Sequence, residues 1–522
     1  MSNHNSFDPL NPVIILTETE SKVAKLLTDY AETINGKDPN QESLELRITG
    51  GWVRDKLLGN QSNDIDIAIN TLTGEEFAEG LAEFIEKSSE VYGITSSGIH
   101  KIEKNPEKSK HLETASTKLY GLDIDFVNLR NEEYTEESRV PVVKFGTPEE
   151  DALRRDATLN ALFYNLSKNK VEDLTKTGLE DLKAGILKTP LQPLKTFLDD
   201  PLRVLRLIRF ASRFNFTIEE NTLNAMKDER IKEALTHKIS RERIGVEIEK
   251  TLIGPNAIYG LDLIDRIGFF SSVFNFGALQ KDVFKFNTEE DKAQATSIFK
   301  SLDTNFSSNL VKFQSLELEK SKLNEYVESI DGNKFNKKLF WLTFILSPWE
   351  SQKYKFNAKK DSFAVELIIK EGLKYSKLDS DSVSKIITKK NDYQGMVNKI
   401  WNGNVLRSEV GLLLRNYDSQ IFPNSLIFNL LDEHINSTKD DTASIISKYE
   451  HFIKYIIEKD LVHVTQLKHL LNGKLICKRF NRKPGPWMSK LLDKILIWQL
   501  DNPKLDEEKC WKYLETIIEE FD

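Results

Sequence analysis

Two short groups of residues near the N-terminus combine features that bind phosphate and metal. Gly50 and Gly51 end a run in which apolar and polar residues alternate, and glycines let backbone N–H groups approach an anion because no Cβ intervenes. Asp64 and Asp66 are two apart in a second alternating run, so both carboxylates project from one face of a strand. Such like charges are unfavourable unless a cation lies between them, and Mg²⁺ takes carboxylate oxygen together with substrate phosphates. The pattern predicts a nucleotidyl-transfer site whose Mg²⁺ cofactor is bound by Asp64 and Asp66.

Either group alone is weak evidence. A single Asp-x-Asp is usually solvated surface, and a single Gly-Gly is usually a turn. Together, and followed by Arg54 and Asp55 at the start of a predicted helix, they resemble motif A of the nucleotidyltransferase superfamily. The form is the Gly-Gly-x-Val-Arg-Asp of tRNA CCA-adding enzymes and bacterial poly(A) polymerases. The resemblance implies that Gly50, Gly51 and Arg54 bind a nucleoside triphosphate.

A third carboxylate is expected on a neighbouring strand. Residues 121–130 return to strand alternation and place Asp123 and Asp125 on one face. Enzymes of this superfamily take a third acid from such a strand. By this resemblance Asp125 is the candidate that joins Asp64 and Asp66 as a catalytic residue.

Residues 152–163 combine arginine, aspartate and asparagine with a packing face of leucine and phenylalanine. Arginine suits bidentate phosphate binding, while Asp and Asn can hydrogen-bond ribose hydroxyls. A purely structural amphipathic helix is the alternative interpretation. The stretch resembles motif B of the same family, with Asn160 in helical register. The resemblance implies that Arg154, Arg155, Asp156 and Asn160 bind the nucleotide.

Residues 198–213 predict a helix with an arginine stripe. Asp199 or Asp200 can cap a helix whose first residue is Pro201. Four arginines on one arc repel each other unless an anion or paired acids neutralise them. The arginines lie on one face of the predicted helix and the apolar residues on the opposite face. The arginines are Arg203, Arg206, Arg209 and Arg213, and the apolar residues are Val204, Leu205, Ile208 and Ala211.

This helix resembles motif D of class II CCA-adding enzymes, written Glu/Asp-Asp-x-x-Arg. In that family the acid and the arginine act as an amino-acid template for the incoming base. The resemblance assigns this role to Asp200 and Arg203. Asp199 stands where the family commonly has Glu, and the implied nucleotide-binding set also includes Asp199 and Arg206.

Two further motifs have structural alternatives. Asp173 and Gly178 lie in a stretch that resembles motif C, a hinge between head and neck, although turn chemistry explains them equally well. Residues 240–250 resemble motif E, a helix that supports the template helix. Arg243 and Glu247 are four apart in it, so an intrahelical ion pair is an adequate explanation.

The spacing of apolar residues predicts the elements around these motifs. An amphipathic helix is predicted over residues 13–35, and another begins at Gly74. Residues 97–118 are lysine-rich and without period. They predict a loop, which is either plain solvated chain or a mobile loop beside the substrate.

From about residue 255 onward the pattern is helical, with polar loops predicted at 303–309 and 437–443. Near the end, residues 478–487 pack basic and aromatic side chains into a turn before a predicted helix at 488–500. Basic and aromatic residues together suit RNA backbone and base stacking, and they serve equally well as plain structure.

Composition sets the remaining limits. The 522-residue chain has 39% hydrophobic and 30% charged residues, which is typical of an ordinary protein with three or four domains. It carries 73 basic and 81 acidic side chains, a net charge of −8. Overall charge therefore does not indicate a nucleic-acid partner, and any RNA surface must be a local basic patch.

The expected location follows from what the sequence lacks. Cys477 and Cys510 have no metal-ligand spacing, which argues against disulfides and zinc and for a reducing compartment. An uninterrupted apolar run of about 18 residues is absent, so no membrane span is expected. Residues 1–9 resemble neither a signal nor a transit peptide. We expect a cytoplasmic and nuclear protein, and the fungal relatives of the family add a mitochondrial form from an upstream start.

These motifs predict an α+β fold. An N-terminal nucleotidyltransferase head with a small mixed β-sheet is followed by an all-helical neck, body and tail. The predicted boundaries are 1–165 for the head, 166–270 for the neck with its template helix, 271–400 for the body and 401–522 for the tail. The tail is predicted to bind tRNA.

The resemblance implies addition and repair of the 3′-terminal CCA of tRNA without a nucleic-acid template. The implied partners are CTP, ATP, and the 3′ end and acceptor arm of tRNA, with no membrane. Two alternatives are open. A bacterial-type poly(A) polymerase shares motifs A and B and differs in whether CTP is used. A catalytically silent RNA-binding protein is the other, and the intact Asp-x-Asp argues against it, since no binding module needs two like charges aimed at a metal.

Overall fold

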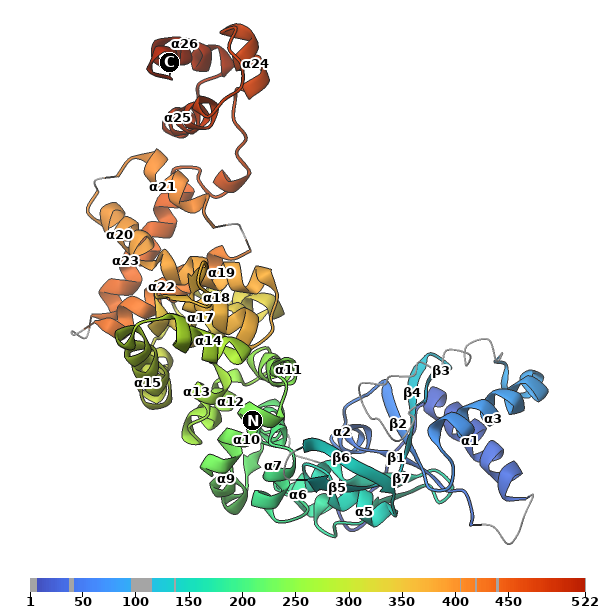
Figure 1. Cartoon of the computed structure of the whole chain (residues 1–522). Helices are drawn as coiled ribbons and strands as arrows, with labels where there is room; N and C mark the ends of the chain where they lie inside the picture. The colour runs from blue at the N-terminus through green and yellow to red at the C-terminus, as the bar shows by residue number, and fades with distance from the viewer. Residues whose placement is uncertain are drawn as a thin grey trace. The chain divides into compact units, whose positions relative to one another are not determined.

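The computed structural model of the chain describes residues 7–36, 42–94, 115–135, 138–403, 405–417, 420–437 and 441–521. The chain forms two compact units, Met1–Ser272 and Val273–Asp522 (Figure 1). The first unit contains a mixed sheet and helices, and the second is built almost wholly of helices. The predicted α+β class, with its small sheet at the N-terminal end, is therefore confirmed. The finer division at residues 165, 270 and 400 stays a prediction.

A six-stranded sheet forms the framework of the first unit. Its strands lie in the order β3-β4-β2-β1-β7-β8, and only β2 and β4 among these neighbours run parallel. On β2 the isoleucines between the two aspartates and beyond them are buried, as the alternation predicts. The bounds are β1 Leu46–Thr49, β2 Asp64–Ile69, β3 Ala115–Leu119, β4 Leu122–Asn128, β7 Leu162–Asn165 and β8 Lys170–Asp173.

Two helices pack against this sheet. α1 (Glu18–Asn35) and α3 (Gly74–Lys87) contact each other and its strands (Figure 1). The helix predicted to begin at Gly74 is confirmed. The helix predicted from residue 13 begins at Glu18 instead, because Thr17 accepts a hydrogen bond from the Glu20 backbone N–H and so closes the helix N-terminus.

The prediction of a loop over residues 97–118 is wrong at the C-terminal end of that range. Residues 115–118 belong to strand β3, which pairs antiparallel with β4. There Lys118 lies 3.2 Å from Asp123 in a cross-strand ion pair. Residues 95–114 lie outside the described residues, so the prediction for them stays open.

A two-stranded ribbon follows the sheet. β5 (Arg130–Thr135) and β6 (Ser138–Phe145) run antiparallel and lead into the short helix α5 (Pro148–Leu153). The Asp151 carboxylate of α5 accepts a hydrogen bond from the Arg130 backbone N–H at 3.1 Å. This bond ties α5 to the start of the ribbon.

The region resembling motif C is a tight turn. The Asp173 carboxylate accepts hydrogen bonds from the backbone N–H groups of Thr175 and Leu179, at 3.1 and 3.0 Å. A Cβ at Gly178 would lie 2.6 Å from the Thr158 carbonyl oxygen, so only glycine fits. Turn chemistry and close packing thus account for both residues.

Helix α8 (Leu202–Phe214) is the centre of the remaining part of the first unit. It packs against α11 and α12, and its predicted apolar face is buried. The helix begins one residue after the predicted Pro201, while the Asp200 carboxylate accepts a hydrogen bond from the Leu202 N–H at 3.1 Å. The other helices are α6 Gly178–Ala184, α7 Pro193–Asp199, α9 Glu220–Met226, α10 Glu229–Lys238, α11 Arg241–Leu252 and α12 Ala257–Arg266, with a short parallel pair of strands, β9 Ile186–Leu187 and β10 Thr217–Ile218.

The second unit departs from the sequence prediction in two places. The loop predicted at 303–309 lies inside helix α15 (Glu289–Gln314), where Leu302, Phe306 and Leu310 are buried at helical spacing. The predicted all-helical region also contains one small hairpin. Its strands are β11 Lys353–Lys355 and β12 Asp361–Phe363. Of the loop predicted at 437–443, residues 438–440 lie outside the described residues, and residues 442 and 443 belong to helix α23 (Thr442–Glu458).

The main helices of the second unit follow one another with short connections. They are α14 Gln280–Phe286, α16 Asn324–Asp331, α17 Lys334–Leu346, α19 Lys377–Thr388, α20 Lys390–Trp401, α21 Arg407–Leu414, α22 Phe422–Asn436, α23 Thr442–Glu458, α24 Gly473–Arg479, α25 Trp487–Asp501 and α26 Glu507–Ile517. The helix predicted at 488–500 is α25. The last three helices share an apolar core around Leu491 and Leu514. No helix among the described residues is both long and apolar enough to cross a bilayer.

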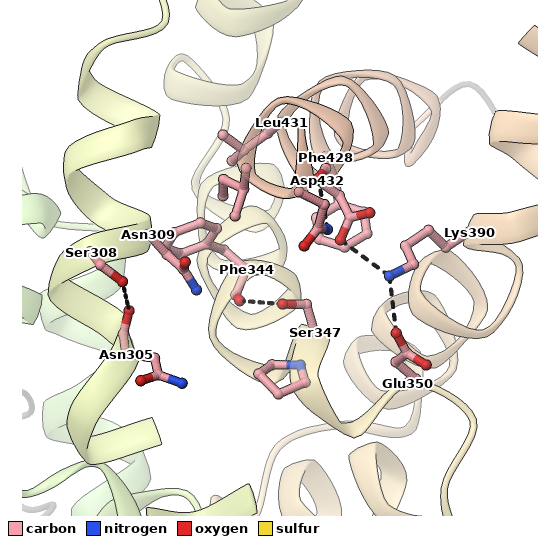
Figure 2. A pocket seen from close by; sticks show the side chains of 13 residues that line it. Asn305, Ser308, Asn309, Phe344, Ser347, Glu350, Lys390, Phe428, Leu431 and Asp432 are labelled. Carbon is pink, nitrogen blue, oxygen red and sulfur yellow. Dashed lines mark hydrogen bonds and ion pairs between the residues drawn. The ribbon is translucent and has the colours of Figure 1, made fainter. Parts of the chain in front are cut away.

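A polar pocket of about 340 Å³ lies among α15, α17, α20 and α22 (Figure 2). Its lysine, Lys390, lies 3.2 Å from both Glu350 and Asp432. One cation against two carboxylates leaves this pocket with a net charge of −1. It is therefore unsuited to a polyphosphate.

Candidate active site

The three candidate catalytic carboxylates lie on adjacent strands. The parallel register of β2 and β4 places Asp66 opposite Asp125 and Asp64 opposite Asp123. On its other side Asp66 lies opposite Thr49 of β1. Residues in register point to the same face of a sheet, so Asp66 stands between Thr49 and Asp125. Asp64 is exposed at the start of the strand, and Asp66 is half-buried.

The pKa of Asp66 reflects this crowding. Burial raises the pKa of the carboxyl, Arg155 opposes the shift, and Asp64 and Asp125 add to it, which brings the pKa to about 6. A cation beside these carboxylates would favour their ionised form. Among the described residues no three His, Cys, Asp or Glu side chains are grouped to enclose a metal by themselves. Mg²⁺ usually takes one or two carboxylates and completes its shell with water and substrate phosphate, so the residues present fit it.

The glycine loop lies next to these acids. Gly50 has a φ of +74°, and a Cβ added there would lie 3.2 Å from the Arg155 guanidinium and 3.9 Å from the Asp66 carboxylate. Glycine is therefore required for both the backbone conformation and the close approach. Helix α2 (Gly51–Leu57) starts immediately afterwards. The first N–H groups of a helix have no intrahelical partner, and here no side-chain cap accepts a hydrogen bond from them.

Arg54 is a buried cation held from several sides. Its guanidinium lies 2.7 Å from Asp55, donates to the Asn160 side-chain oxygen at 2.5 Å, and lies over the ring of Phe214 at 4.7 Å. Burial lowers the pKa of Arg54, and the Asp55 carboxylate opposes that shift. These contacts hold the Arg54 guanidinium in one position on α2, the helix that follows the glycine loop.

The segment resembling motif B is not the helix that was predicted. α5 ends at Leu153, a 3₁₀ turn occupies Thr158–Asn160, and the chain then enters β7. The prediction that Asn160 is in helical register with the preceding arginines is wrong. Ala157 has an extended backbone and separates α5 from the 3₁₀ turn. Asn160 nevertheless donates to the Asp156 carboxylate at 3.0 Å.

Asp151 organises the two arginines of this segment. It accepts hydrogen bonds from Arg154, at 2.6 and 2.9 Å, and from Arg155, at 2.7 and 3.1 Å. Burial alone would raise the pKa of Asp151, but Arg155 and Arg154 outweigh it and bring the pKa to about 2. Arg155 also donates to the Thr49 hydroxyl at 2.6 Å, which joins the segment to β1.

Each arginine of the predicted stripe on α8 faces an acid from another segment. The closest approaches between the charged groups are 3.8 Å from Arg203 to Glu132, 2.7 Å from Arg206 to Asp156, 2.5 Å from Arg209 to Glu247 and 3.5 Å from Arg213 to Asp55. The acids come from β5, the segment after α5, helix α11 and helix α2. The mutual repulsion of the arginines is thus offset by four partners far apart in sequence.

The alternative explanation of Arg243 and Glu247 as an ion pair within α11 is wrong, because each pairs with a residue of another segment. Glu247 turns to Arg209 of α8, and the Arg243 guanidinium lies 3.5 Å from the Asp200 carboxylate. Because α11 packs against α8, Glu247 is within reach of Arg209 and Arg243 is within reach of Asp200. Helix α11 therefore contacts the arginine stripe through Glu247 and Asp200 through Arg243.

These groups surround a cleft of about 430 Å³ in the first unit. Every residue predicted to bind nucleotide lines it except Asp199, and so does Asp66. Asp64 and Asp125 do not line it. Asp199 ends α7, where burial raises the pKa of its carboxyl and Arg203 opposes the shift. Eight arginines and four carboxylates line the cleft, a net charge of +4.

Sequence reasoning omitted five of the lining residues from the site. They are Glu132, Arg209, Phe210, Arg213 and Arg243. The arginine spacing on α8 contained a signal for Arg209 and Arg213. Nothing local marks Glu132, which lies on β5, a strand that packs beside α5.

Residues 46–188 match the family model described as "Poly A polymerase head domain", and residues 215–278 match "Probable RNA and SrmB- binding site of polymerase A". The head match, the carboxylate strand and the cationic cleft define a nucleotidyltransferase.

The mitochondrial CCA tRNA nucleotidyltransferase of Candida glabrata is 46% identical, covering 98% of this chain and 97% of its own length. That of Saccharomyces cerevisiae is 45% identical, over 98% and 95%. The chain belongs to the CCA tRNA nucleotidyltransferase family. The Thermotoga maritima CCA-adding enzyme, solved as a complex with tRNA, has a TM-score of 0.60 at 21% identity over 97% of both chains, which shows the same fold.

Gly50→Ala is expected to weaken nucleoside triphosphate binding because its Cβ would press on the Arg155 guanidinium. Gly59→Ala is the matched control, since Gly59 has a φ of +76° and nothing within 4 Å of an added Cβ. Both variants should lose about 1–3 kcal/mol of stability from backbone strain, because both glycines have a positive φ. Calorimetric titration and urea unfolding measure the two effects, and equal binding by both variants would contradict the assignment.

Proposed function

We propose that this chain adds and repairs the 3′-terminal CCA of tRNA, using CTP and ATP and releasing pyrophosphate. The observation that carries the proposal is the cleft, where the glycine loop, the Asp-x-Asp strand and α8 converge with a net charge of +4. A chain of net charge −8 that gathers arginines in one hollow suits a polyanion such as a nucleoside triphosphate. The names of the fungal relatives support CCA addition over poly(A) synthesis and over silent RNA binding.

The roles follow from position in the cleft. The Gly50 and Gly51 backbone N–H groups and Arg54 hold the triphosphate, where glycine leaves room for the phosphates. Arg155, with Asp156 and Asn160, holds the ribose end, and Arg154 and Arg206 complete the nucleotide-binding set. The protein needs to align the attacking hydroxyl with the α-phosphate and neutralise charge.

Asp64 and Asp66 are the proposed magnesium ligands, and Asp125 is the proposed third catalytic carboxylate. Bound there, two Mg²⁺ ions would lower the pKa of the tRNA 3′-hydroxyl and neutralise the departing pyrophosphate. A carboxylate must be ionised to act as a ligand, so the raised pKa of Asp66, about 6, means that magnesium binding there weakens as the pH falls toward that value. Arg155 beside it favours that ionised form.

Asp200 and Arg203 are the proposed base-reading pair. Cytosine and adenine each present an amino donor beside a ring-nitrogen acceptor, whereas uracil and guanine present a carbonyl acceptor beside an N–H donor. A carboxylate beside a guanidinium complements the first two and not the others. Side-chain exposures of 17% for Asp200 and 10% for Arg203 support a real cost for a mismatch. Each buried group left unpaired costs about 1–3 kcal/mol. Asp199, beside this pair, is kept in the proposed set.

RNA contacts are proposed beyond the cleft. The family match over residues 215–278 supports a contact there. In the predicted tail, Arg479 lies over the Trp511 ring at 4.6 Å and Arg482 over the Trp487 ring at 5.7 Å. Such arginine and aromatic pairs suit the backbone and bases of the acceptor arm.

A mitochondrial location is proposed by extension from the names of the two fungal relatives. The cytoplasmic and nuclear location expected from the sequence stays a prediction. Fractionation of cells expressing the full gene with a C-terminal tag tests both.

Purified protein with magnesium and a tRNA ending at the discriminator base should add two cytidines from CTP alone. Adding ATP should then add one adenosine. Sequencing of the product ends checks this outcome. A long homopolymeric tail would instead favour the polymerase alternative.

Asp64→Ala and Asp66→Ala should each abolish transfer while leaving the fold intact, because a metal site built on two carboxylates cannot lose one. Asp123→Ala is the control, since Asp123 lies opposite Asp64 in register but is exposed and paired with Lys118. Initial rates at saturating magnesium provide the measurement. Retention of more than a few per cent of activity by either site variant would sink the assignment.

Arg203→Ala and Asp200→Ala should lower CTP and ATP incorporation and narrow the gap to UTP and GTP. Wild-type discrimination of roughly a hundredfold is expected, since two mismatched groups are involved and each 1.4 kcal/mol is about tenfold. Kinetics with all four nucleotides gives the ratios. A CTP to UTP ratio that stays at the wild-type value in both variants would mean that this pair does not read the base.

A further inference from the structure

Glu132 is a buried carboxylate of the cleft to which no motif assigns a role. It lies on β5, and its side chain is 8% exposed. One of its oxygens lies 2.6 Å from the Arg154 guanidinium, and the other lies 3.8 Å from the Arg203 guanidinium. One acid thus connects the segment resembling motif B to the proposed base-reading arginine.

The Arg154 side of this bridge is rigid. Arg154 uses Nε and Nη2 on the Asp151 carboxylate, at 2.9 and 2.6 Å, and Nη1 on Glu132. Asp151 itself has 2% of its side chain exposed and also binds Arg155 and the Arg130 backbone. Buried, charge-assisted bonds of this kind are strong and directional. Arg154 therefore links the Glu132 carboxylate to Asp151, which is itself bound to the backbone at the start of β5.

The Arg203 side is looser. Arg206 and Arg209 approach their acids to 2.7 and 2.5 Å, but Arg203 approaches Glu132 only to 3.8 Å. Nη1 of Arg203 also donates to the Thr196 carbonyl oxygen at 3.5 Å. At 3.8 Å the Glu132 carboxylate still attracts the guanidinium strongly in a buried site without a short hydrogen bond to it. The charge of Glu132 can therefore orient Arg203 without replacing the base as a hydrogen-bond partner.

We propose that Glu132 positions Arg203 for selection between amino and keto bases, with Arg154 and Asp151 as its brace. This inference rests on the proposed function, because it deepens the role given there to Arg203. Without the Glu132 charge, Arg203 would be drawn toward the other acids of the cleft, Asp156 and Asp200. The guanidinium would then leave the orientation that pairs with cytosine and adenine and rejects uracil.

The test compares Glu132→Gln and Glu132→Asp with a matched control, Glu172→Gln. Glu172 also forms a partly buried ion pair in the first unit, 2.7 Å from Arg47, but it does not line the cleft. The measurements are kcat and KM for CTP and UTP on tRNA lacking its CCA, together with the thermal unfolding midpoint of each variant.

Glu132→Gln should lower the CTP to UTP ratio of kcat/KM by about tenfold, the change that a loss of about 1.4 kcal/mol produces. Glu132→Asp keeps the charge but withdraws it by one methylene, so its ratio should fall between those of the wild type and Glu132→Gln. Glu172→Gln should lower the unfolding midpoint and leave the ratio unchanged. This difference separates a positioning role from a merely structural one.

A wild-type ratio in Glu132→Gln, with a midpoint lowered as in Glu172→Gln, overturns the inference. If Glu132→Gln does not fold, Glu132→Asp decides alone, and a wild-type ratio in that variant overturns it equally. Failure of the proposed function would look different, because the wild-type protein itself would then add no cytidine to tRNA. A wild type that adds CCA while Glu132 variants keep its selectivity refutes only the role of Glu132.

Discussion

Repulsion among four arginines on one helix is the constraint on which the site depends. α8 holds Arg203, Arg206, Arg209 and Arg213 along one stripe, and such a stripe is unfavourable unless acids face it. The acids come from β5, the segment after α5, α11 and α2. Placing each acid requires the ribbon, the turn and the packing of α11 on α8. The ion pairs therefore define where these elements meet.

The same arrangement explains why the cleft keeps its charge. Two of the acids that face the stripe, Glu247 and Asp55, do not line the cleft. The groups that do line it, eight arginines and four carboxylates, carry a net charge of +4. The arginines are held in place, so little ordering is needed when a polyanion binds. The pocket around Lys390 in the second unit, with its net charge of −1, shows that a polar hollow alone does not suit a nucleotide.

Local pattern predicted the parts of the site that depend on strand and helix periods. The two-residue spacing of Asp64 and Asp66 and the arginine stripe on α8 were readable from the sequence. Contacts between distant segments could not be predicted from local pattern. Glu247 of α11 pairs with Arg209 of α8, and Glu132, which approaches Arg203, belongs to no recognised motif. The error at 303–309 has the same origin, since a polar stretch hid Phe306, which is buried at helical spacing.

The most direct test of this account is the structure of the protein with a non-hydrolysable CTP analogue and magnesium. The account predicts that the pairs of Arg206 with Asp156 and Arg209 with Glu247 persist, with the cytosine edge against Asp200 and Arg203 and the triphosphate over Gly50. A complex in which these pairs break and the α8 arginines turn onto the phosphates would contradict it.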